Sequence, residues 1–284
     1  MQLERVTPRL AVENSATENV LPAALRDLRA TLIVAHPGHE LRVHGWLEGA
    51  RPVVYVLTDG SGHSGQSRLD STTRVLARAC AQTGAFYGRF TDVQLYTAIL
   101  DKHIDFFVDI AEEIAEALLR DGVDYVVGDS AEGYNPTHDI CRAIIDTAVA
   151  LVNKNRSDPV LNLEFPVMAA GNPLGGRSAA GAIHLHLSTL SIDRKLAAAR
   201  SYAELRDEIS GLIKEMGINS FGIEELRPAA NGTAIDRAVE EPPFYENYGE
   251  KQVAEGHYRR VIRYREHVLP VSEALSGYVQ KRAL

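Results

Sequence analysis

Continuous apolar runs alternate with stretches of helical periodicity through the first half of the chain. The apolar runs are short and rich in β-branched residues, as expected of strands covered on both faces, and they lie at residues 31–35, 52–58 and 124–128. Helical patterns lie at residues 43–50, 74–83, 104–120 and 137–152. The resulting β-α-β-α-α-β-α order predicts an α/β fold, with a Rossmann-like, mostly parallel sheet flanked by helices.

The second half of the chain has a looser pattern. Short strands are predicted at residues 161–168 and 182–188, around a Gly-rich segment at 169–177. Predicted helices at residues 191–215 and 251–280 flank a loop at 227–243. We therefore expect an N-terminal extension at 1–29, an α/β core at 30–155, and an α+β part at 156–284 that completes the same domain and the pocket rim and ends in helices.

Composition narrows the class of protein. The chain has 284 residues, of which 45% are hydrophobic and 24% charged, enough to bury a sizeable core. Its net charge of -8 and the absence of a Lys/Arg cluster argue against nucleic acid as a partner and favour a small-molecule substrate. A secretory signal and a membrane span are not expected, so the interpretation is a soluble, cytoplasmic protein, possibly a homo-oligomer. Cys80 and Cys141 are both expected within helices, without a CxxC motif, and do not predict a disulfide or a thiolate metal site.

Three histidines lie where predicted strands end. His36 follows the first strand, His39 comes three residues later on the sheet-facing side of the next helix, and His138 follows the third strand after a loop. Ligands of such sheets bind beyond the carboxyl ends of the strands. Three neutral imidazoles can hold Zn²⁺ or another divalent metal and leave one coordination position open, so the sequence predicts a metal site.

Glu40 offers an alternative ligand. With two histidines it would form a two-His-one-carboxylate face of the kind that suits iron. Adjacent helical residues point about 100° apart, so His39 and Glu40 are not expected to bind the same ion.

These motifs resemble those of a known superfamily. Leu-Ile-Val-Ala-His-Pro at residues 32–37, Leu-Thr-Asp-Gly at 57–60 and the segment from Asp124 to His138 are similar to motifs of the PIG-L or LmbE-like zinc-dependent de-N-acetylases. The resemblance covers about residues 30–155. It implies that His36 and His138 are zinc ligands, that His39 replaces an aspartate ligand, and that the fold is the superfamily's α/β fold.

The resemblance also shows departures at the positions of the proton-transfer groups. Gly38 stands where the superfamily has its general base, Asn135 replaces a histidine that assists the tetrahedral intermediate, and Thr137 replaces an aspartate. A glycine cannot accept a proton, so another carboxylate or the metal-bound hydroxide must do so in a hydrolase of this type. The candidate carboxylates are Asp59, Asp129, Glu132 and Asp139.

Further roles are assigned to polar residues near the three histidines. Asp59, Glu132 and Asn135 are candidate catalytic residues, with Asn135 and Tyr134 able to hydrogen-bond a developing oxyanion. The candidate substrate-binding residues are His63, Tyr134 and Asp129. Glu40 and Asp139 are expected behind the metal ligands, with Glu40 orienting an imidazole.

For two of these residues, a purely structural role is the alternative to a functional one. Asp59 begins an Asp-Gly pair, which is also a common turn device, and His63 lies in a glycine-rich loop that is either a plain connection or a mobile lid. The remaining histidines have no better claim than that of ordinary surface or core residues, although His184 and His186 alternate on one strand face that can enter the pocket.

Two hypotheses about function follow. The first is a metal-dependent hydrolase that acts on an N-acylated sugar or related polar metabolite through metal-activated water. The second is a non-catalytic descendant of the same fold that binds a sugar or a sugar-nucleotide. A nucleotide-cofactor enzyme ranks below both, because no Gly-rich phosphate turn follows the first strand.

Overall fold

A seven-stranded sheet forms the centre of the protein. The computed structural model describes residues 21–62, 65–154, 156–168, 181–229 and 242–282, so His63 and residues 169–177 lie outside the described part. The strand order is β3-β2-β1-β4-β5-β7-β6. The strands are β1 (Ala30–Val34), β2 (Val53–Thr58), β3 (Gln82–Phe90), β4 (Tyr125–Asp129), β5 (Leu161–Phe165), β6 (Ile183–His186) and β7 (Ile223–Pro228).

The first five strands pair in parallel, whereas β7 runs antiparallel to both β5 and β6. The predicted α/β class with a mostly parallel sheet is therefore confirmed. The α-helices are α1 (His44–Ala50), α2 (Leu69–Arg78), α3 (Asp92–Leu100), α4 (Ile104–Arg120), α5 (Pro136–Asn153), α6 (Thr189–Arg200), α7 (Arg206–Met216), α8 (Phe244–Ala254) and α9 (Leu269–Lys281). Short 3-10 or π turns are η1 (Ala23–Leu25), η2 (His39–Val43), η3 (Ala203–Leu205), η4 (Ile218–Gly222) and η6 (Tyr264–Val268).

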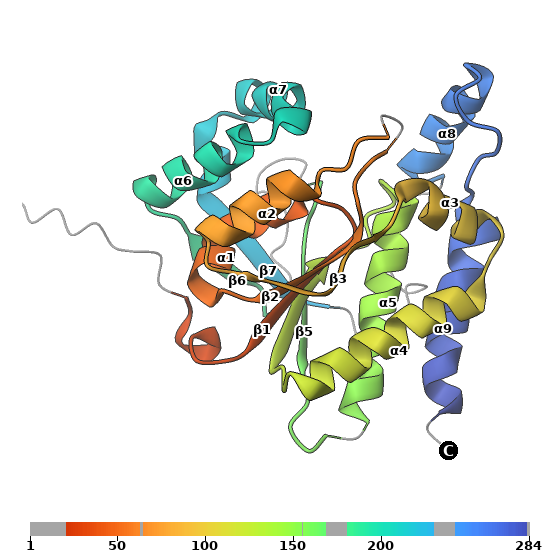
Figure 1. Cartoon of the computed structure of the whole chain (residues 1–284), viewed down its shortest axis with the longest axis horizontal. Coiled ribbons are helices and arrows are strands. Elements are labelled where there is room, and N and C mark those ends of the chain that lie inside the picture. Colours follow the sequence, from red (N-terminus) through yellow and green to blue (C-terminus); the bar gives the residue numbers. More distant parts are fainter. Residues whose placement is uncertain (1–20, 63–64, 155, 169–180, 230–241, 283–284) are drawn as a thin grey trace, which may run out of the picture.

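Helices cover both faces of the sheet (Figure 1). Successive residues of a strand point to opposite faces, so Ile33 packs with residues of α4, α5 and α9, whereas Leu32 and Val34 pack with residues of α1, α2 and α6. Burial on both faces explains why the central strands read as continuous apolar runs.

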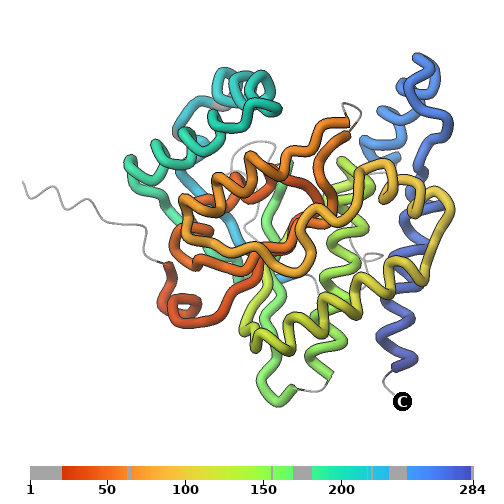
Figure 2. Tube along the Cα trace, in the orientation of Figure 1, coloured from red at the N-terminus to blue at the C-terminus, as the bar shows by residue number. Residues whose placement is uncertain are grey.

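The C-terminal helix packs against helices from the first half of the chain. Figure 2 shows the C-terminal helix α9 beside α4 and α5. Val271 and Leu275 of α9 are fully buried and belong to the same apolar cluster as Ile33 of β1. Residues more than two hundred positions apart therefore share one core.

Two strands were missed by the sequence pattern, β3 and β7. Residues 74–83 were predicted as a helix, but α2 ends at Arg78 and β3 begins at Gln82. β3 is an edge strand with exposed residues, and its pairing with β2 is interrupted by register shifts, so it lacks a clean apolar run. Cys80 consequently lies beyond α2, exposed and with φ of 57°, and not within a helix, whereas Cys141 is buried in α5 as expected.

Two predicted long helices are each divided. The helix predicted at 191–215 is broken between α6 and α7, where the fully buried Tyr202 turns inward. The helix predicted at 251–280 consists of the end of α8, the π turn η6 and α9, which has Pro270 in its first turn. The loop predicted at 227–243 begins with the end of β7, and residues 230–241 lie outside the described part.

The helices that the structure describes differ from membrane-spanning segments. None of them combines the length and the apolar character that crossing a bilayer requires.

Candidate active site

The three predicted histidines lie together at the carboxyl edge of the sheet. His36 follows β1, His39 begins η2, and His138 lies in the first turn of α5, which comes after β4. β1 and β4 are parallel neighbours, so their carboxyl ends meet at one edge. The ring centroids are 5.4 Å apart for His36 and His39, 5.1 Å for His36 and His138, and 4.5 Å for His39 and His138. We call these residues the histidine trio.

The donor set and the spacing of the trio fit a divalent metal ion. With Zn–N bonds of about 2.0 to 2.1 Å, three imidazoles on one tetrahedral ion would have centroids roughly 5 Å apart. Among the described residues, His36 Nε2 and His138 Nδ1 are buried without a hydrogen-bond partner, as is Oδ1 of the neighbouring Asp129. As the side chains stand, however, the described residues contain no group of three or more His, Cys, Asp or Glu side chains that could hold a metal ion.

Two polar side chains hold the ring of His36. Its Nδ1 lies 2.8 Å from Thr58 Oγ1 and 3.0 Å from Asp92 Oδ1. Asp92 is fixed in turn by the backbone N–H of Gly62, which donates to its Oδ2 at 2.5 Å. Burial acts to raise the pKa of Asp92, but interactions with His36, Thr58 and Gly62 outweigh it and leave that pKa below its ordinary value.

Neither Asp92 nor Thr58 was among the predicted site residues. Asp92 comes directly after β3, so recognising that strand would have put Asp92 at the same carboxyl edge as the trio. Because β3 was not predicted, Asp92 could not be placed at this edge from the sequence.

Asp129, at the end of β4, holds the ring of His39. Its Oδ2 lies 2.8 Å from His39 Nδ1 and also accepts the backbone N–H of Ala35 at 2.8 Å. Asp129 was predicted to bind substrate, but the structure places it behind an imidazole, fully buried. A carboxylate at Nδ1 fixes the ring orientation and leaves Nε2 available as an electron-pair donor.

Glu40 does not orient an imidazole, which corrects the prediction for this residue. Its Oε2 accepts the backbone N–H of Gly38 at 2.8 Å, and its Oε1 accepts the hydroxyl of Tyr202. Burial raises the pKa of Glu40, although these hydrogen bonds oppose the rise. The carboxylate therefore joins the turn that carries His36 and His39 to the segment between α6 and α7.

His138 is the most deeply enclosed member of the trio. Burial lowers its pKa well below the ordinary value, and repulsion from His39 and His36 lowers it further. The neutral imidazole that results near pH 7 is the form that binds a metal ion.

The loop before His138 is held by the polar residues that were predicted to act on substrate or metal. Asp139 Oδ1 accepts the backbone N–H groups of Glu132 at 3.0 Å and Gly133 at 3.2 Å. Glu132 Oε2 accepts those of Val167 at 3.1 Å and Met168 at 2.9 Å. Burial raises the pKa of Glu132, while the two backbone hydrogen bonds act to lower it. These carboxylates accept hydrogen bonds from backbone N–H groups and so stabilise the loop. This role differs from the catalytic one predicted for Glu132.

Asn135 and Asp59 also bond to local groups. Asn135 caps α5 by accepting the backbone N–H of Thr137 at 2.8 Å, and its Nδ2 donates to the hydroxyl of Tyr96 at 3.2 Å. Asp59 Oδ1 accepts the backbone N–H of Ser61 at 3.0 Å and its hydroxyl at 2.7 Å. The turn role that was the alternative for Asp59 is thus the one its contacts show.

The two histidines of β6, His184 and His186, lie outside the trio. His184 Nε2 lies 3.5 Å from Glu225 Oε2 across β6 and β7, and His186 is exposed. Tyr134 is half-exposed, with its ring centroid 6.5 Å from that of His138.

Gly38 occupies a position that accepts no side chain without strain. Its φ is 106°, and a Cβ atom built there would lie 2.8 Å from Leu205 Cδ1 of η3. The space beside Gly38 is therefore filled by a leucine from the C-terminal part of the chain.

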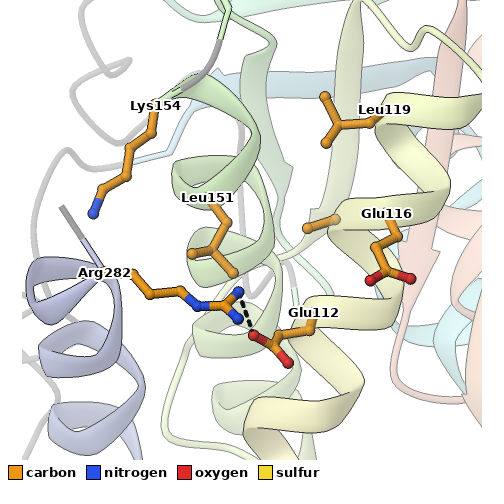
Figure 3. A pocket seen from close by; sticks show the side chains of 7 residues that line it. Glu112, Glu116, Leu119, Leu151, Lys154 and Arg282 are labelled. Carbon is orange, nitrogen blue, oxygen red and sulfur yellow. Dashed lines mark ion pairs between the residues drawn. The ribbon is translucent and has the colours of Figure 1, made fainter. Parts of the chain in front are cut away.

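A cavity of about 150 Å³ lies away from the trio, between α4, α5 and α9 (Figure 3). Arg282 faces Glu112 there at 2.5 Å, and Lys154 lies at the end of α5 opposite to His138. Sixteen residues of helix separate Lys154 from His138, or about 24 Å. This cavity is not part of the candidate active site.

Comparison with known proteins gives a structural likeness only. No protein-family profile matches the sequence, and no curated protein matches it. The fold is similar to the α/β fold of a structurally characterised deacetylase.

The individual matches have low sequence identity. The zinc-inhibited form of the teicoplanin deacetylase Orf2 is 15% identical, with a TM-score of 0.50, covering 72% of this chain and 100% of that one. The A40926 pseudoaglycone deacetylase Dbv21 is 17% identical, with a TM-score of 0.48, covering 72% of this chain and 99% of that one.

Proposed function

We propose that this chain is a metal-dependent hydrolase of the de-N-acetylase type, which removes the acyl group from an N-acylated sugar or a related polar metabolite. The observation that carries the proposal is the histidine trio, gathered at the carboxyl edge of the sheet with two rings held by buried carboxylates. A bound divalent ion would supply polarisation of the acyl carbonyl and a lowered pKa of water.

The residues of the chain prepare the site for that chemistry. Asp92 and Asp129 fix the orientation of the His36 and His39 rings, while burial lowers the pKa of His138 and favours its neutral form. Because Gly38 has no side chain that can accept a proton, we assign proton acceptance to Asp129, whose Oδ1 is buried next to His39 without a hydrogen-bond partner among the described residues.

The test combines metal analysis with an assay of acid release. The purified protein is expected to contain close to one equivalent of divalent metal and to release acetate from N-acetylated amino sugars. His36→Ala and His138→Ala should lose most of the metal and at least about 100-fold in kcat/KM, since each removes a ligand. His186→Ala, which changes an exposed histidine on β6, serves as the matched control and should keep both properties.

Equal metal content and turnover in the parent and in the His36→Ala and His138→Ala proteins would exclude the proposed site. Loss in His186→Ala as well would show that the changes act through general damage.

The second candidate function is a non-catalytic sugar-binding protein. The specific observation in its favour is that Leu205 fills the region of the missing base beside Gly38. It predicts a thermal shift with N-acetylated sugars and no released acid under any metal condition. Detection of acetate release from any of these sugars excludes it.

A further inference from the structure

We propose that the cavity between α4, α5 and α9 binds a free α-amino acid with a short aliphatic side chain. Its walls carry both signs of charge and its floor is apolar, which is complementary to a zwitterion with a small hydrocarbon group. Binding here is separate from the candidate active site and does not depend on the proposed function. We call the cavity the zwitterion site, and the side chains that define it are Glu112, Glu116, Leu119, Leu151, Lys154 and Arg282.

Helical spacing brings these side chains together. Glu112, Glu116 and Leu119 follow one another at intervals of four and three residues, so they share one face of α4. Leu151 and Lys154 lie three residues apart at the end of α5, and Arg282 directly follows α9. Figure 3 shows the two glutamates on one side of the cavity, Lys154 and Arg282 on the other, and Leu151 between them.

The floor of the zwitterion site is apolar and incompletely covered. Ala115 and Leu151 are buried, whereas the neighbouring Leu119 is 46% exposed. The cavity has a volume of about 150 Å³, and an engineered cavity of about that size admits benzene. An isopropyl group is smaller than benzene and would cover the exposed part of Leu119, which is favourable because it removes apolar surface from water. A sugar needs a larger pocket.

The acidic wall favours an ammonium group. Oε1 of Glu112 already accepts hydrogen bonds from Arg282, at 2.5 Å, and from the hydroxyl of Tyr278. Glu116 is exposed and forms no ion pair with any residue that the structure describes. The three helices α4, α5 and α9 each end one residue from a residue of the site, and helix C-termini carry partial negative charge. We therefore place the ammonium group of the ligand at Glu116.

The basic wall favours a carboxylate. Lys154 Nζ donates to the backbone carbonyl of Val279 and pairs with no carboxylate in the described part of the chain. An ammonium group has three N–H donors, so two of them stay available to a ligand. The contact with Glu112 holds the guanidinium of Arg282 across the cavity and leaves further N–H donors free for the same carboxylate.

The two walls together exclude ligands of a single charge. An aliphatic amine would meet Lys154 and Arg282, and a fatty acid or a phosphate would meet the two glutamates and the three helix C-termini. An α-amino acid places one charge against each wall and its side chain against the floor. Valine is the probe that matches the size of the cavity.

The experiment is a two-dimensional NMR titration of the isotope-labelled protein with L-valine and its matched analogues. Valine is expected to bind with a Kd on the order of 1 mM, since the ion pairs are near the surface and the apolar contact is small. Isobutylamine lacks only the carboxylate and isovalerate lacks only the ammonium group, so each should bind at least about tenfold more weakly. Glycine, which lacks the side chain, should bind more weakly as well.

Substitutions in the two walls locate the bound valine. Glu116→Gln and Lys154→Gln each remove one charge at an exposed position and should weaken valine binding at least about tenfold. Glu113→Gln is the matched control, because Glu113 is an exposed acid on the same helix that faces Arg89 at 2.7 Å. It should bind valine like the parent. Valine should also raise the Tm of the parent and of the control more than that of the two wall variants.

Three outcomes overturn the proposal. Absence of a saturable shift up to about 20 mM valine shows that the cavity binds no amino acid. Equal affinity for valine, isobutylamine and isovalerate shows that only the apolar floor is used and that charge is not recognised. Binding that survives in Glu116→Gln and Lys154→Gln but is lost in His36→Ala assigns valine to a metal ion at the histidine trio.

Discussion

At the scale of single residues, the backbone at Gly38 does not accept an aspartate side chain without strain. A side chain at φ of 106° is strained, and its Cβ would press against Leu205 at 2.8 Å. We expect Gly38→Asp to lower the free energy of unfolding by about 1 to 3 kcal/mol and to give no gain in acetate release. Urea denaturation and the acetate assay measure the two effects.

Gly211 of α7 provides the control for this substitution. Nothing lies within 4 Å of a Cβ built there, and its φ is not positive, so Gly211→Ala should leave stability unchanged or raise it by up to about 1 kcal/mol. A Gly38→Asp protein as stable as the parent and more active would contradict the account of this position.

Asp92 provides a second test at this scale. Asp92→Asn keeps the size of the side chain but removes the charge beside His36 Nδ1. Metal affinity should fall about 10- to 100-fold, because a carboxylate behind a ligating imidazole orients it and raises its basicity. Competition with a chelating dye gives the affinity, and Asp70→Asn, on the exposed face of α2, should leave it unchanged. Unaltered affinity in Asp92→Asn would mean that the His36 ring needs no such partner.

At the scale of elements, a buried ion pair fixes the start of α1 and the turn that carries His39. Lys195 of α6 donates to Glu224 Oε1 of β7 and to the backbone carbonyl of Arg42 in η2, both at 2.8 Å. Glu224 also accepts the backbone N–H groups of Gly45 and Trp46 at 2.8 Å. One carboxylate therefore caps the first turn of α1 while one ammonium group holds the end of η2.

Removing the cation leaves Glu224 buried without its counter-charge. Lys195→Ala should lower the free energy of unfolding by about 3 to 5 kcal/mol. Arg194→Ala breaks the neighbouring but exposed pair with Glu48 and should cost about 0 to 1 kcal/mol. Denaturant titration of both variants measures their free energies of unfolding. Equal decreases in the two variants would show that the buried Lys195–Glu224 pair contributes no more to stability than the exposed pair.

Prediction from sequence worked best for elements with an uninterrupted pattern. The helices at 104–120 and 137–152 match α4 and α5 closely, and the three central strands are found within one or two residues of their predicted bounds. β3 and β7 were missed because neither presents a continuous apolar run: β3 is an irregular edge strand, and β7 carries Glu224 and Glu225 among its apolar residues. The local sequence pattern does not predict a strand whose buried polar residues form hydrogen bonds with residues far away in the sequence.

At the scale of the whole molecule, the interleaving of α9 with the first half of the chain predicts cooperative unfolding. Leu275 is fully buried in the cluster that also contains Ile33 and Ile114, so α9 shares a core with β1 and α4. We expect one urea transition, coincident by circular dichroism and tyrosine fluorescence, with Leu275→Ala lowering the free energy of unfolding by about 2 to 5 kcal/mol.

A different unfolding curve would contradict the prediction of a single transition. Two separated transitions, with Leu275→Ala shifting only one of them, would mean that the C-terminal part folds as a separate unit. The exposed Leu190→Ala is the control and should change stability by no more than about 0.5 kcal/mol.

The sequence by itself determined the class of fold and the order of the three histidines, because both depend on local pattern: apolar runs mark the buried strands, and His36, His39 and His138 lie in segments that follow strand ends. Tertiary structure alone decided which groups contact His36 and the turn beside it. Asp92 reaches His36 and Leu205 reaches Gly38 from elements that the sequence does not place beside them, and Glu40 and Glu132 accept hydrogen bonds from backbone N–H groups. The physical reason is that a hydrogen bond or a ring contact depends on distance in space, which pairing and packing fix only when the whole chain has folded.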